Sequence, residues 1–320
     1  MTTTPNSVSR QPSLRFRIAQ IACRQLPPIL GMRLRAWLYP DHLGEQDGFT
    51  FMVRSQTGGW FKGTTSEMHA CAFGICGYST YRNWAIAIAL CKPGDTIIEV
   101  GANIGTETVG FADIVGCRGH VYAFEPFPAN LESLRETLKL APCANVTVMP
   151  FALGEDDGEF AFVPPTGANT GVGRLLQRDR PAPPESLSVQ CRTLDSLASE
   201  LPAPTFICMD AEDSETYVLR GGAAYIQQHR PGIVVEAHRK VQPMLHEELQ
   251  QLGYHAFVVG RFGLNPVGEL AKRGADWFCV HQSRIEDVQR VDRVLRRCVL
   301  MPCVSGMNPM TGIAQKPGRK

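Results

Sequence analysis

A glycine turn between two acidic residues is the part of the sequence best suited to bind a ligand. The segment Glu99-Val100-Gly101-Ala102-Asn103-Ile104-Gly105 follows a short apolar stretch, and Glu125 stands 20 residues beyond Gly105. Glycines allow a tight turn and a close approach of the ligand, and a carboxylate at this spacing can accept hydrogen bonds from both hydroxyls of a ribose. The pattern predicts a nucleoside-type cofactor site.

The residue at position 103, midway between Gly101 and Gly105, indicates which class of cofactor the turn can bind. A dinucleotide-binding turn reads Gly-x-Gly-x-x-Gly, and its second glycine clears space for a pyrophosphate. Asn103 holds that position here, so a cofactor without a diphosphate, such as S-adenosylmethionine, fits better. We expect Glu99 to bind the amino group of the methionine tail, or to order water around it, and the small Ala152 to leave a slot for adenine. The predicted cofactor-binding residues are Glu99, Gly101, Asn103, Gly105, Glu125, Pro126 and Ala152.

If S-adenosylmethionine donates its methyl group to a hydroxyl, the protein must also provide a group that removes the hydroxyl proton. Acidic residues and a histidine follow two later apolar stretches and are the candidates. Histidine accepts a proton near neutral pH, whereas Asp210 needs its pKa raised by burial or by like-charged neighbours such as Glu212. The alternatives are a helix cap for Asp210 and a hydrogen-bonded loop position for His238. Glu236, in the same stretch as His238, is a further candidate for removing the proton. The predicted catalytic residues are Asp210, Glu212 and His238; carboxylates also suit magnesium, but no metal site is predicted.

These side chains require a frame that places strand ends side by side, and the chain alternates between apolar strands and helices. Strands are expected at 96–100, 119–124, 146–149, 205–209, 233–236, 255–259 and 277–280. Helices are expected at 79–91, 104–115, 128–140, 215–224, 243–252 and 285–298. This alternation predicts a mainly parallel seven-stranded sheet with helices on both faces, whose last two strands form an antiparallel hairpin. Ligands bind at the carboxyl ends of such strands.

A long loop interrupts this alternation. Extra strands are expected at 159–163 and 187–193, and the loop 164–184 between them contains Asn169-Thr170-Gly171 and the arginines Arg174, Arg178 and Arg180. A loop of this length over the ligand edge of a sheet favours a lid that recognises the acceptor; a mobile surface loop is the alternative.

Residues 93–260 resemble the FkbM family of methyltransferases. The matching stretches are Pro-Gly-Asp-Thr-Ile-Ile-Glu-Val-Gly-Ala-Asn-Ile-Gly (93–105), Val-Tyr-Ala-Phe-Glu-Pro (121–126), Ala-Leu-Gly (152–154), Thr-Leu-Asp-Ser-Leu (193–197) and Val-Leu-Arg-Gly-Gly (218–222). The resemblance implies a Rossmann-like α/β fold of the class I methyltransferase type, with methylation of hydroxyl groups on sugars or secondary metabolites. The family pattern Asp-x-Glu-Gly-x-Glu reads Asp210-Ala211-Glu212-Asp213-Ser214-Glu215 here, so Asp213 replaces a glycine. In a left-handed conformation, Asp is tolerated at modest cost.

The chain is expected to divide into four regions. These are a basic N-terminal extension (1–40), a lead-in with short strands and a helix (41–92), a methyltransferase domain (93–303) and a C-terminal tail (304–320). Residues 1–40 contain six arginines and no acidic residue, and Leu14–Ala22 can form a short basic amphipathic helix. A transit peptide or an arm with weak contact to a membrane surface are alternatives to an extension that packs loosely. If the extension is loose, its deletion should leave the melting curve nearly unchanged.

Composition narrows the partners and the compartment. A formal net charge of +1 provides no global field that would recruit nucleic acid, and no apolar run reaches the roughly 18 residues of a membrane span. The 11 cysteines are odd in number and contain no Cys-x-x-Cys pair, so a zinc site or a disulfide framework is not expected and a cytoplasmic location is predicted.

The sequence therefore predicts an S-adenosylmethionine-dependent methyltransferase that modifies a hydroxyl of a small-molecule or carbohydrate acceptor. Two other classes remain open. One is a nicotinamide-dependent oxidoreductase on the same type of sheet, and the other is a nucleoside-binding module that has lost catalysis, for which Asp213 is the one indication.

Overall fold

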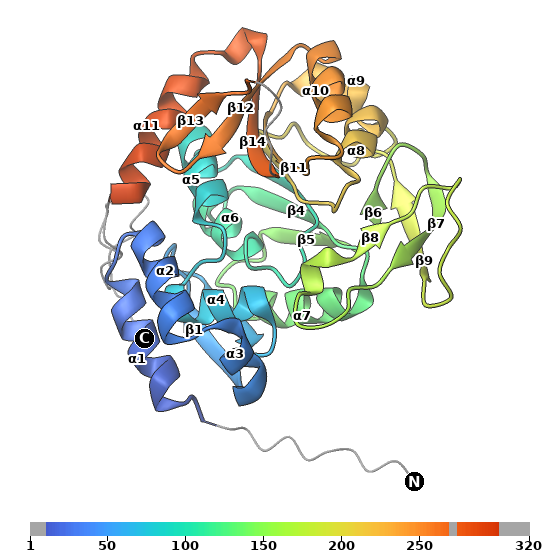
Figure 1. Cartoon of the computed structure of the whole chain (residues 1–320). Coiled ribbons are helices and arrows are strands. Elements are labelled where there is room, and N and C mark those ends of the chain that lie inside the picture. The colour runs from blue at the N-terminus through green and yellow to red at the C-terminus, as the bar shows by residue number, and fades with distance from the viewer. Residues whose placement is uncertain (1–10, 269–273, 301–320) are drawn as a thin grey trace.

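The computed structural model describes residues 11–268 and 274–300, and an eight-stranded sheet forms its centre (Figure 1). The strand order is β13-β12-β14-β11-β10-β3-β4-β5. The strands are β3 (Thr96–Val100), β4 (His120–Phe124), β5 (Val146–Met149), β10 (Phe206–Met209), β11 (Gly232–Ala237), β12 (Tyr254–Gly260), β13 (Gly263–Pro266) and β14 (Ala275–His281). Neighbouring pairs from β5 to β11 are parallel, whereas β14 is antiparallel to both β11 and β12.

Helices cover both faces of this sheet. They are α5 (Tyr81–Leu90), α6 (Thr108–Val115), α7 (Pro128–Leu138), α8 (Glu215–Gly221), α9 (Ala223–His229), α10 (Gln242–Gln251) and α11 (Asp287–Leu300), with the 3-10 turn η2 (Gln282–Arg284) before the last. Successive strand residues point to opposite faces: Ile97 joins the core formed with α5, α6 and α11, and Ile98 joins the core formed with α8, α9 and α10. The predicted Rossmann-like α/β fold is confirmed.

The strand at the edge of the sheet was not expected from the sequence. The antiparallel pairing predicted between 255–259 and 277–280 is confirmed as the pairing of β12 with β14. The short β13 adds an eighth strand by forming a hairpin with β12. Because β13 contains Asn265 and Pro266, which are uncommon in strands, its pairing depends on the turn that brings it back along β12.

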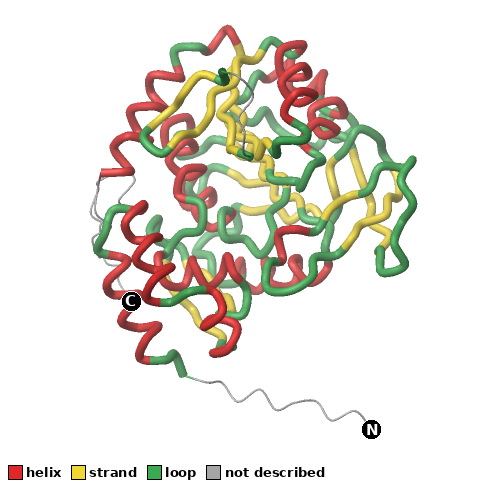
Figure 2. Tube along the Cα trace, in the orientation of Figure 1, coloured by secondary structure: helices red, strands yellow, loops and turns green. Residues whose placement is uncertain are grey.

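A second, smaller sheet lies to one side of the main one (Figure 2, right). It has the order β6-β9-β7-β8 and contains β6 (Ala152–Leu153), β7 (Gly158–Val163), β8 (Arg174–Leu175) and β9 (Leu187–Arg192). The predicted strands at 159–163 and 187–193 correspond to β7 and β9. The loop expected at 164–184 contains the 3-10 turn η1 (Thr170–Val172) as well as β8.

The N-terminal region packs as part of the folded body. Its elements are α1 (Leu14–Arg24), α2 (Pro28–Leu38), α3 (Asp41–Asp47), β1 (Thr50–Arg54), β2 (Trp60–Thr64) and α4 (Met68–Cys76). Phe16 is only 2% exposed, and its ring lies 5.5 Å from that of Tyr39 and 5.1 Å from that of Phe49. The expectation of a loosely packed extension is therefore wrong for residues 11–40, because Phe16 and Cys23 complete one face of an apolar core.

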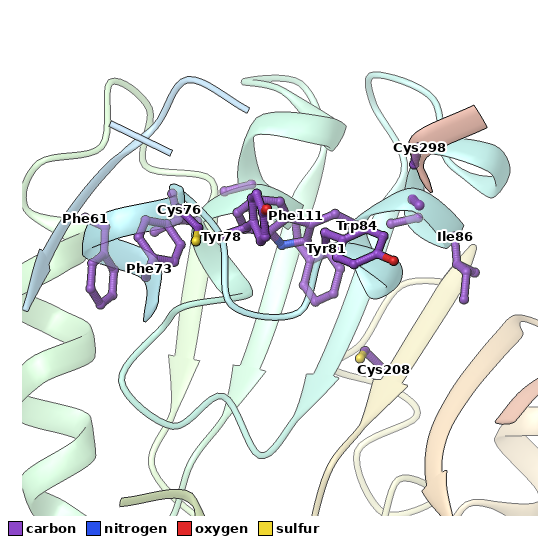
Figure 3. Packing of buried hydrophobic residues seen from close by; sticks show 14 of the residues in the cluster. Phe61, Phe73, Cys76, Tyr78, Tyr81, Trp84, Ile86, Phe111, Cys208 and Cys298 are labelled. Atoms are coloured by element: carbon purple, nitrogen blue, oxygen red, sulfur yellow. The ribbon is translucent and has the colours of Figure 1, made fainter. Parts of the chain in front are cut away.

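This core continues into the sheet. Figure 3 shows Phe61 and Phe73 at one end of the cluster, and Tyr81, Trp84 and Phe111 toward the strands. The rings of Phe73 and Trp84 are 6.0 Å apart, so α4 of the N-terminal region and α5 of the sheet domain share buried contacts. The predicted boundaries at 41 and 92 are therefore not marked by a break in packing, and residues 304–320 lie outside the described part.

Two further sequence expectations concern the cysteines and the membrane. Cys117 and Cys143 form a single disulfide with Cα atoms 5.5 Å apart, a bridge that the sequence analysis, which expected no disulfide framework, did not identify. The segments after α6 and α7 bring these two cysteines together, and a local sequence pattern does not reveal such proximity. The buried cysteines outside any disulfide include Cys23, Cys71, Cys76, Cys91, Cys191, Cys208 and Cys279. No helix in residues 11–268 and 274–300 is long and apolar enough to cross a bilayer.

Candidate active site

A cavity opens at the carboxyl ends of β3, β4, β10 and β11, where the fold brings together side chains that are far apart in sequence. Eight of the predicted site residues line it: Glu99, Gly101, Asn103, Glu125, Pro126, Ala152, Asp210 and Glu212. The predicted residues Gly105 and His238 are not part of the lining. Gly105 lies against Leu134 beneath the turn, and His238 stands behind Glu236, which does line the cavity.

The glycine turn adopts a conformation that explains its composition. Gly101 has a φ of 83°, and a Cβ placed on it would lie 1.8 Å from the carbonyl oxygen of Asp210. Gly105 has a φ of 88°, and a Cβ there would lie 2.6 Å from Leu134 Cδ1. Asn103, with a φ of 49°, also takes the left-handed conformation, which Asn tolerates better than most residues. The turn thus joins the ends of β3 and β10 closely, as a cofactor loop requires.

Glu125 organises this turn as well as facing the cavity. Its carboxylate accepts hydrogen bonds from the backbone N–H groups of Asn103 at 2.7 Å and Phe127 at 2.8 Å. Its side chain is almost fully buried, and burial raises the pKa of Glu125 to about 7. Each carboxylate oxygen can accept more than one hydrogen bond, so Glu125 can hold the turn and still accept from a ligand hydroxyl.

Two further acids face the same space, Glu99, which is buried, and Glu107, which is partly buried. Glu99 is 3% exposed, and its Oε2 has no hydrogen-bond partner among the described residues. Burial raises the pKa of Glu99 well above its usual value. Glu107, at the start of α6, accepts two hydrogen bonds from the side-chain amide of Asn83 at 3.1 and 2.9 Å, and burial raises its pKa to about 7. Sequence reasoning missed Glu107, since Asn83 lies on the preceding helix α5 and no local motif joins the two.

A second group of acids surrounds Glu236 at the end of β11. Asp210 is open to the cavity and otherwise enclosed by protein, and burial together with the neighbouring Glu236 raises the pKa of Asp210 well above its usual value. Burial and the charge of Glu236 also raise the pKa of Glu212. Carboxyl oxygens of Asp210 and Glu236 lie within 4.8 Å of one another, so a proton on Asp210 relieves the repulsion between the two groups.

His238 lies between two carboxylates. Its Nδ1 is 2.9 Å from Asp213 Oδ1, and its Nε2 is 3.3 Å from Glu236 Oε1. Burial lowers the pKa of His238, but the hydrogen bond that its Nδ1–H donates to Asp213 and the charges of Glu236 and Asp213 outweigh this effect, so the pKa is raised overall. Asp213 therefore orients the imidazole, and Glu236 connects it to the cavity.

The residue that departs from the family pattern is explained by this contact. Asp213 has a φ of 72° and the adjacent Glu212 a φ of 47°. The position is left-handed, which is why glycine suits it. In this chain the aspartate at the same position supplies a partner to His238.

The acids also form two sets of donors with the chemistry of a cation site. Donor atoms of Glu212, Glu236 and His238 lie within 4.8 Å of one another, as do those of Asp210, Glu215 and Glu236. Oxygen donors of this kind suit Mg²⁺, and the imidazole widens the choice to transition metals. Glu236 belongs to both sets; the sequence analysis placed it among the candidate proton acceptors at the strand ends but not among the predicted catalytic residues.

The loop at 164–184 closes one side of the cavity with polar side chains. Thr170 Oγ1 donates to Asn103 Oδ1 at 2.9 Å, and Asn169 Oδ1 lies 3.2 Å from Nε2 of His69. Sequence reasoning also missed His69, which lies on α4 and lines the cavity. By contrast, the predicted acceptor-binding arginines do not line it; Arg178 stacks on Phe160 at 4.4 Å. The loop lines the cavity with its Asn169-Thr170-Gly171 turn, and the charge of Arg174 acts from outside the lining on Glu212, whose pKa it lowers in part.

Comparisons with known proteins agree with the motifs. The model of the FkbM methyltransferase domain matches residues 99–258, which are 160 of the 320 residues. Hexuronic acid methyltransferase AglP of Haloferax volcanii is 29% identical over 151 residues, which cover 47% of this chain and 58% of AglP. Protein-L-isoaspartate O-methyltransferase of Ignicoccus hospitalis is 38% identical over 66 residues, covering 21% of this chain and 31% of that protein.

Among solved structures, the methyltransferase FkbM of Methylobacillus flagellatus aligns with 17% identity and a TM-score of 0.43, over 82% of this chain and 58% of that one. The chain spans less than two thirds of the length of these relatives. The match of the domain model to half of the chain, on a sheet with the predicted turn and acids at its strand ends, establishes that the chain belongs to the family of the FkbM methyltransferase domain.

Proposed function

We propose that the protein is an S-adenosylmethionine-dependent O-methyltransferase that acts on a hydroxyl group of a neutral sugar or a related small molecule. The observation that supports this most is a single cavity that joins the glycine turn and Glu99 to the acids around Glu236. Family membership provides the cofactor, S-adenosylmethionine. The acceptor and the atom that is methylated are inferred from the side chains of the cavity.

The cofactor suits the charge of this cavity. S-adenosylmethionine is positively charged at its sulfur and at its amino group, and the described lining contains several carboxylates and no lysine or arginine. The unpartnered Oε2 of Glu99 can accept a hydrogen bond from an ammonium group. The pyrophosphate of a nicotinamide dinucleotide would instead meet an acidic lining and the side chain of Asn103, which argues against an oxidoreductase.

Each cofactor contact has a candidate residue. Glu125 lies at the end of β4, the position at which a carboxylate meets a ribose diol in such sheets. Gly101 lets the cofactor approach the backbone, and Ala152 and Leu153 offer a small apolar wall to adenine. When bound, S-adenosylmethionine would supply an electrophilic methyl group, and its positively charged sulfur would keep the electrons of the broken bond.

The acids around Glu236 are suited to hold the acceptor and to take its proton. A hydroxyl bound there can donate to Asp210 or Glu236, since both carboxyl groups reach the cavity. As the acceptor oxygen bonds to the methyl carbon, its proton must move to a base, for which the candidates are Asp210, Glu212, Glu236 and His238. Asp213 and His238 then position Glu236 through the contacts described above. The raised pKa values of Asp210 and Glu212 bring these two carboxyl groups closer to the neutral range in which a general base is most effective.

The absence of lysine and arginine from the described lining indicates the charge of the acceptor that the cavity would favour. AglP is named as a methyltransferase of hexuronic acid. An acidic lining would repel the carboxylate of such a sugar and favour an uncharged one. We therefore expect this chain to prefer a neutral sugar over the corresponding uronic acid.

The test is the transfer of tritium from methyl-labelled S-adenosylmethionine to matched pairs of neutral sugars and uronic acids. The full chain should label the neutral member more efficiently. Asp210→Asn and Glu236→Gln should each lower turnover by roughly 10²–10⁴-fold if the residue is the base, while affinity for S-adenosylhomocysteine stays nearly unchanged. Glu132→Gln, an exposed glutamate outside the cavity, is the control. Cofactor binding without transfer to any acceptor would instead support the catalytically silent module.

A further inference from the structure

The two N-terminal helices each have a second apolar stripe on the side away from the core. Successive helical residues turn by about 100°. On α1 the buried residues are Phe16, Ala19 and Cys23. Leu14, Ile18 and Ile21 fall on the opposite side and are 74%, 51% and 69% exposed. A helix on the surface of a globular protein normally carries polar residues there.

The second helix repeats this arrangement. Its buried face contains Pro28, Gly31 and Arg35, whereas Leu30 and Trp37 lie opposite and are 49% and 74% exposed. Both helices pack on α4 and against each other, and they lie at the outer edge of the molecule (Figure 1, lower left). The two stripes therefore face away from the protein body.

Exposed apolar side chains are concentrated in this region. Six of the eleven large hydrophobic residues that are exposed in the described chain lie between residues 14 and 52. A shallow groove between α1 and β1 is lined by Arg17, Ile21 and Met52, so the apolar surface of α1 extends to the neighbouring strand. Concentrated apolar surface of this kind marks an interaction site more often than scattered residues do.

The charge of this surface indicates its partner. Arg17 borders the stripe of α1, and Arg33 lies between Leu30 and Trp37 on α2; both arginines are exposed. Arg15, on the same helix as Arg17, is exposed as well, whereas Arg35 is buried and paired with Asp41. A second copy of the chain would present the same positive charges and be repelled, whereas an anionic surface would be attracted.

We infer that α1 and α2 dock the protein on the headgroup region of an anionic lipid bilayer. Tryptophan and the aliphatic side chains enter the boundary between headgroups and acyl chains, and the arginines contact the anionic headgroups. The core-facing sides of the same helices remain packed on α4, so docking needs no unfolding. This surface is separate from the cavity and adds a location to the proposed methyl transfer.

The test is co-sedimentation of the full chain with vesicles of phosphatidylcholine, with or without phosphatidylserine. Binding should be stronger to the mixed vesicles and should weaken as salt is added. Trp37→Ser should lower the partition coefficient by roughly tenfold or more, and Arg17→Gln by about fivefold. Phe262→Ser, which removes an equally apolar residue that is 59% exposed on the turn after β12, should have no effect.

Thermal melting of each variant checks that the fold is intact, because the substituted side chains are exposed. If the protein binds neither type of vesicle, the inference is wrong. So would equal losses in Trp37→Ser and Phe262→Ser, or a dimer in sedimentation equilibrium that Trp37→Ser dissociates while vesicle binding is absent.

Discussion

Replacing Glu125 gives the sharpest test of the cofactor site. In Glu125→Gln the side chain keeps its length and one carbonyl oxygen, but the negative charge that would accept hydrogen bonds from the ribose is lost. Hydrogen bonds to a charged group contribute about 1.5–3 kcal/mol, which corresponds to roughly 10- to 150-fold weaker binding. S-adenosylhomocysteine is the suitable probe, because it contains the same ribose and cannot be turned over.

The structure requires a control for stability in this experiment. Glu125 accepts from the backbone N–H groups of Asn103 and Phe127, and leaving a buried N–H unpaired costs about 1–3 kcal/mol. Affinity should therefore be measured by calorimetry well below the melting temperature of the variant, beside Glu132→Gln on the exposed side of α7. A folded Glu125→Gln protein that binds S-adenosylhomocysteine as tightly as the unmodified chain would refute the placement of the ribose.

Three further predictions follow from the structure. Burial raises the pKa of Glu125 to about 7, and the ribose needs the deprotonated carboxylate. Affinity for S-adenosylhomocysteine should therefore be full above pH 7 and fall by up to about tenfold for each pH unit below it. Calorimetry at several pH values should show this dependence in the unmodified chain and not in Glu125→Gln. Phe16→Ala should cost about 3–5 kcal/mol of stability, and deletion of residues 1–40 should lower the melting temperature clearly. Ile18→Ala, on the exposed side of α1, should change the unfolding curve little. Equal melting curves for these three variants and the unmodified chain would contradict the packing of α1. Asp213→Gly should relieve the left-handed conformation of the aspartate and so preserve or raise stability. The same substitution should lower turnover, and it should lower the pKa of His238 measured by NMR. An unchanged pKa of His238 would show that the contact between Asp213 and His238 is absent in solution.

Short-range patterns in the sequence were sufficient to predict most of the fold. The strands β3, β4, β10 and β11 are apolar runs bounded by turn residues, and each is followed by a stretch with helical periodicity. Local physical chemistry therefore decides where these elements lie. The glycine turn was also predictable, because the left-handed conformations of Gly101 and Gly105 are available mainly to glycine.

Tertiary structure decided which side chains meet. Glu107 finds Asn83 on another helix, His69 meets Asn169 across 100 residues, and no periodicity encodes such pairs. The burial of α1 was missed for a related reason: its sequence contains apolar residues on two opposite sides, and only packing on α4 shows which side is core.

The surroundings of His238 depend on both the local sequence and the tertiary structure. The sequence shows an aspartate at position 213 where the family pattern has glycine, and the left-handed backbone there follows from local geometry. The contact with His238 exists only because β10 and β11 are adjacent and parallel, which places the residues after both strands at the same edge of the sheet. The residue types of the site are thus a property of the sequence, whereas their distances and pKa values arise from strand order and burial, which depend on the whole chain at once.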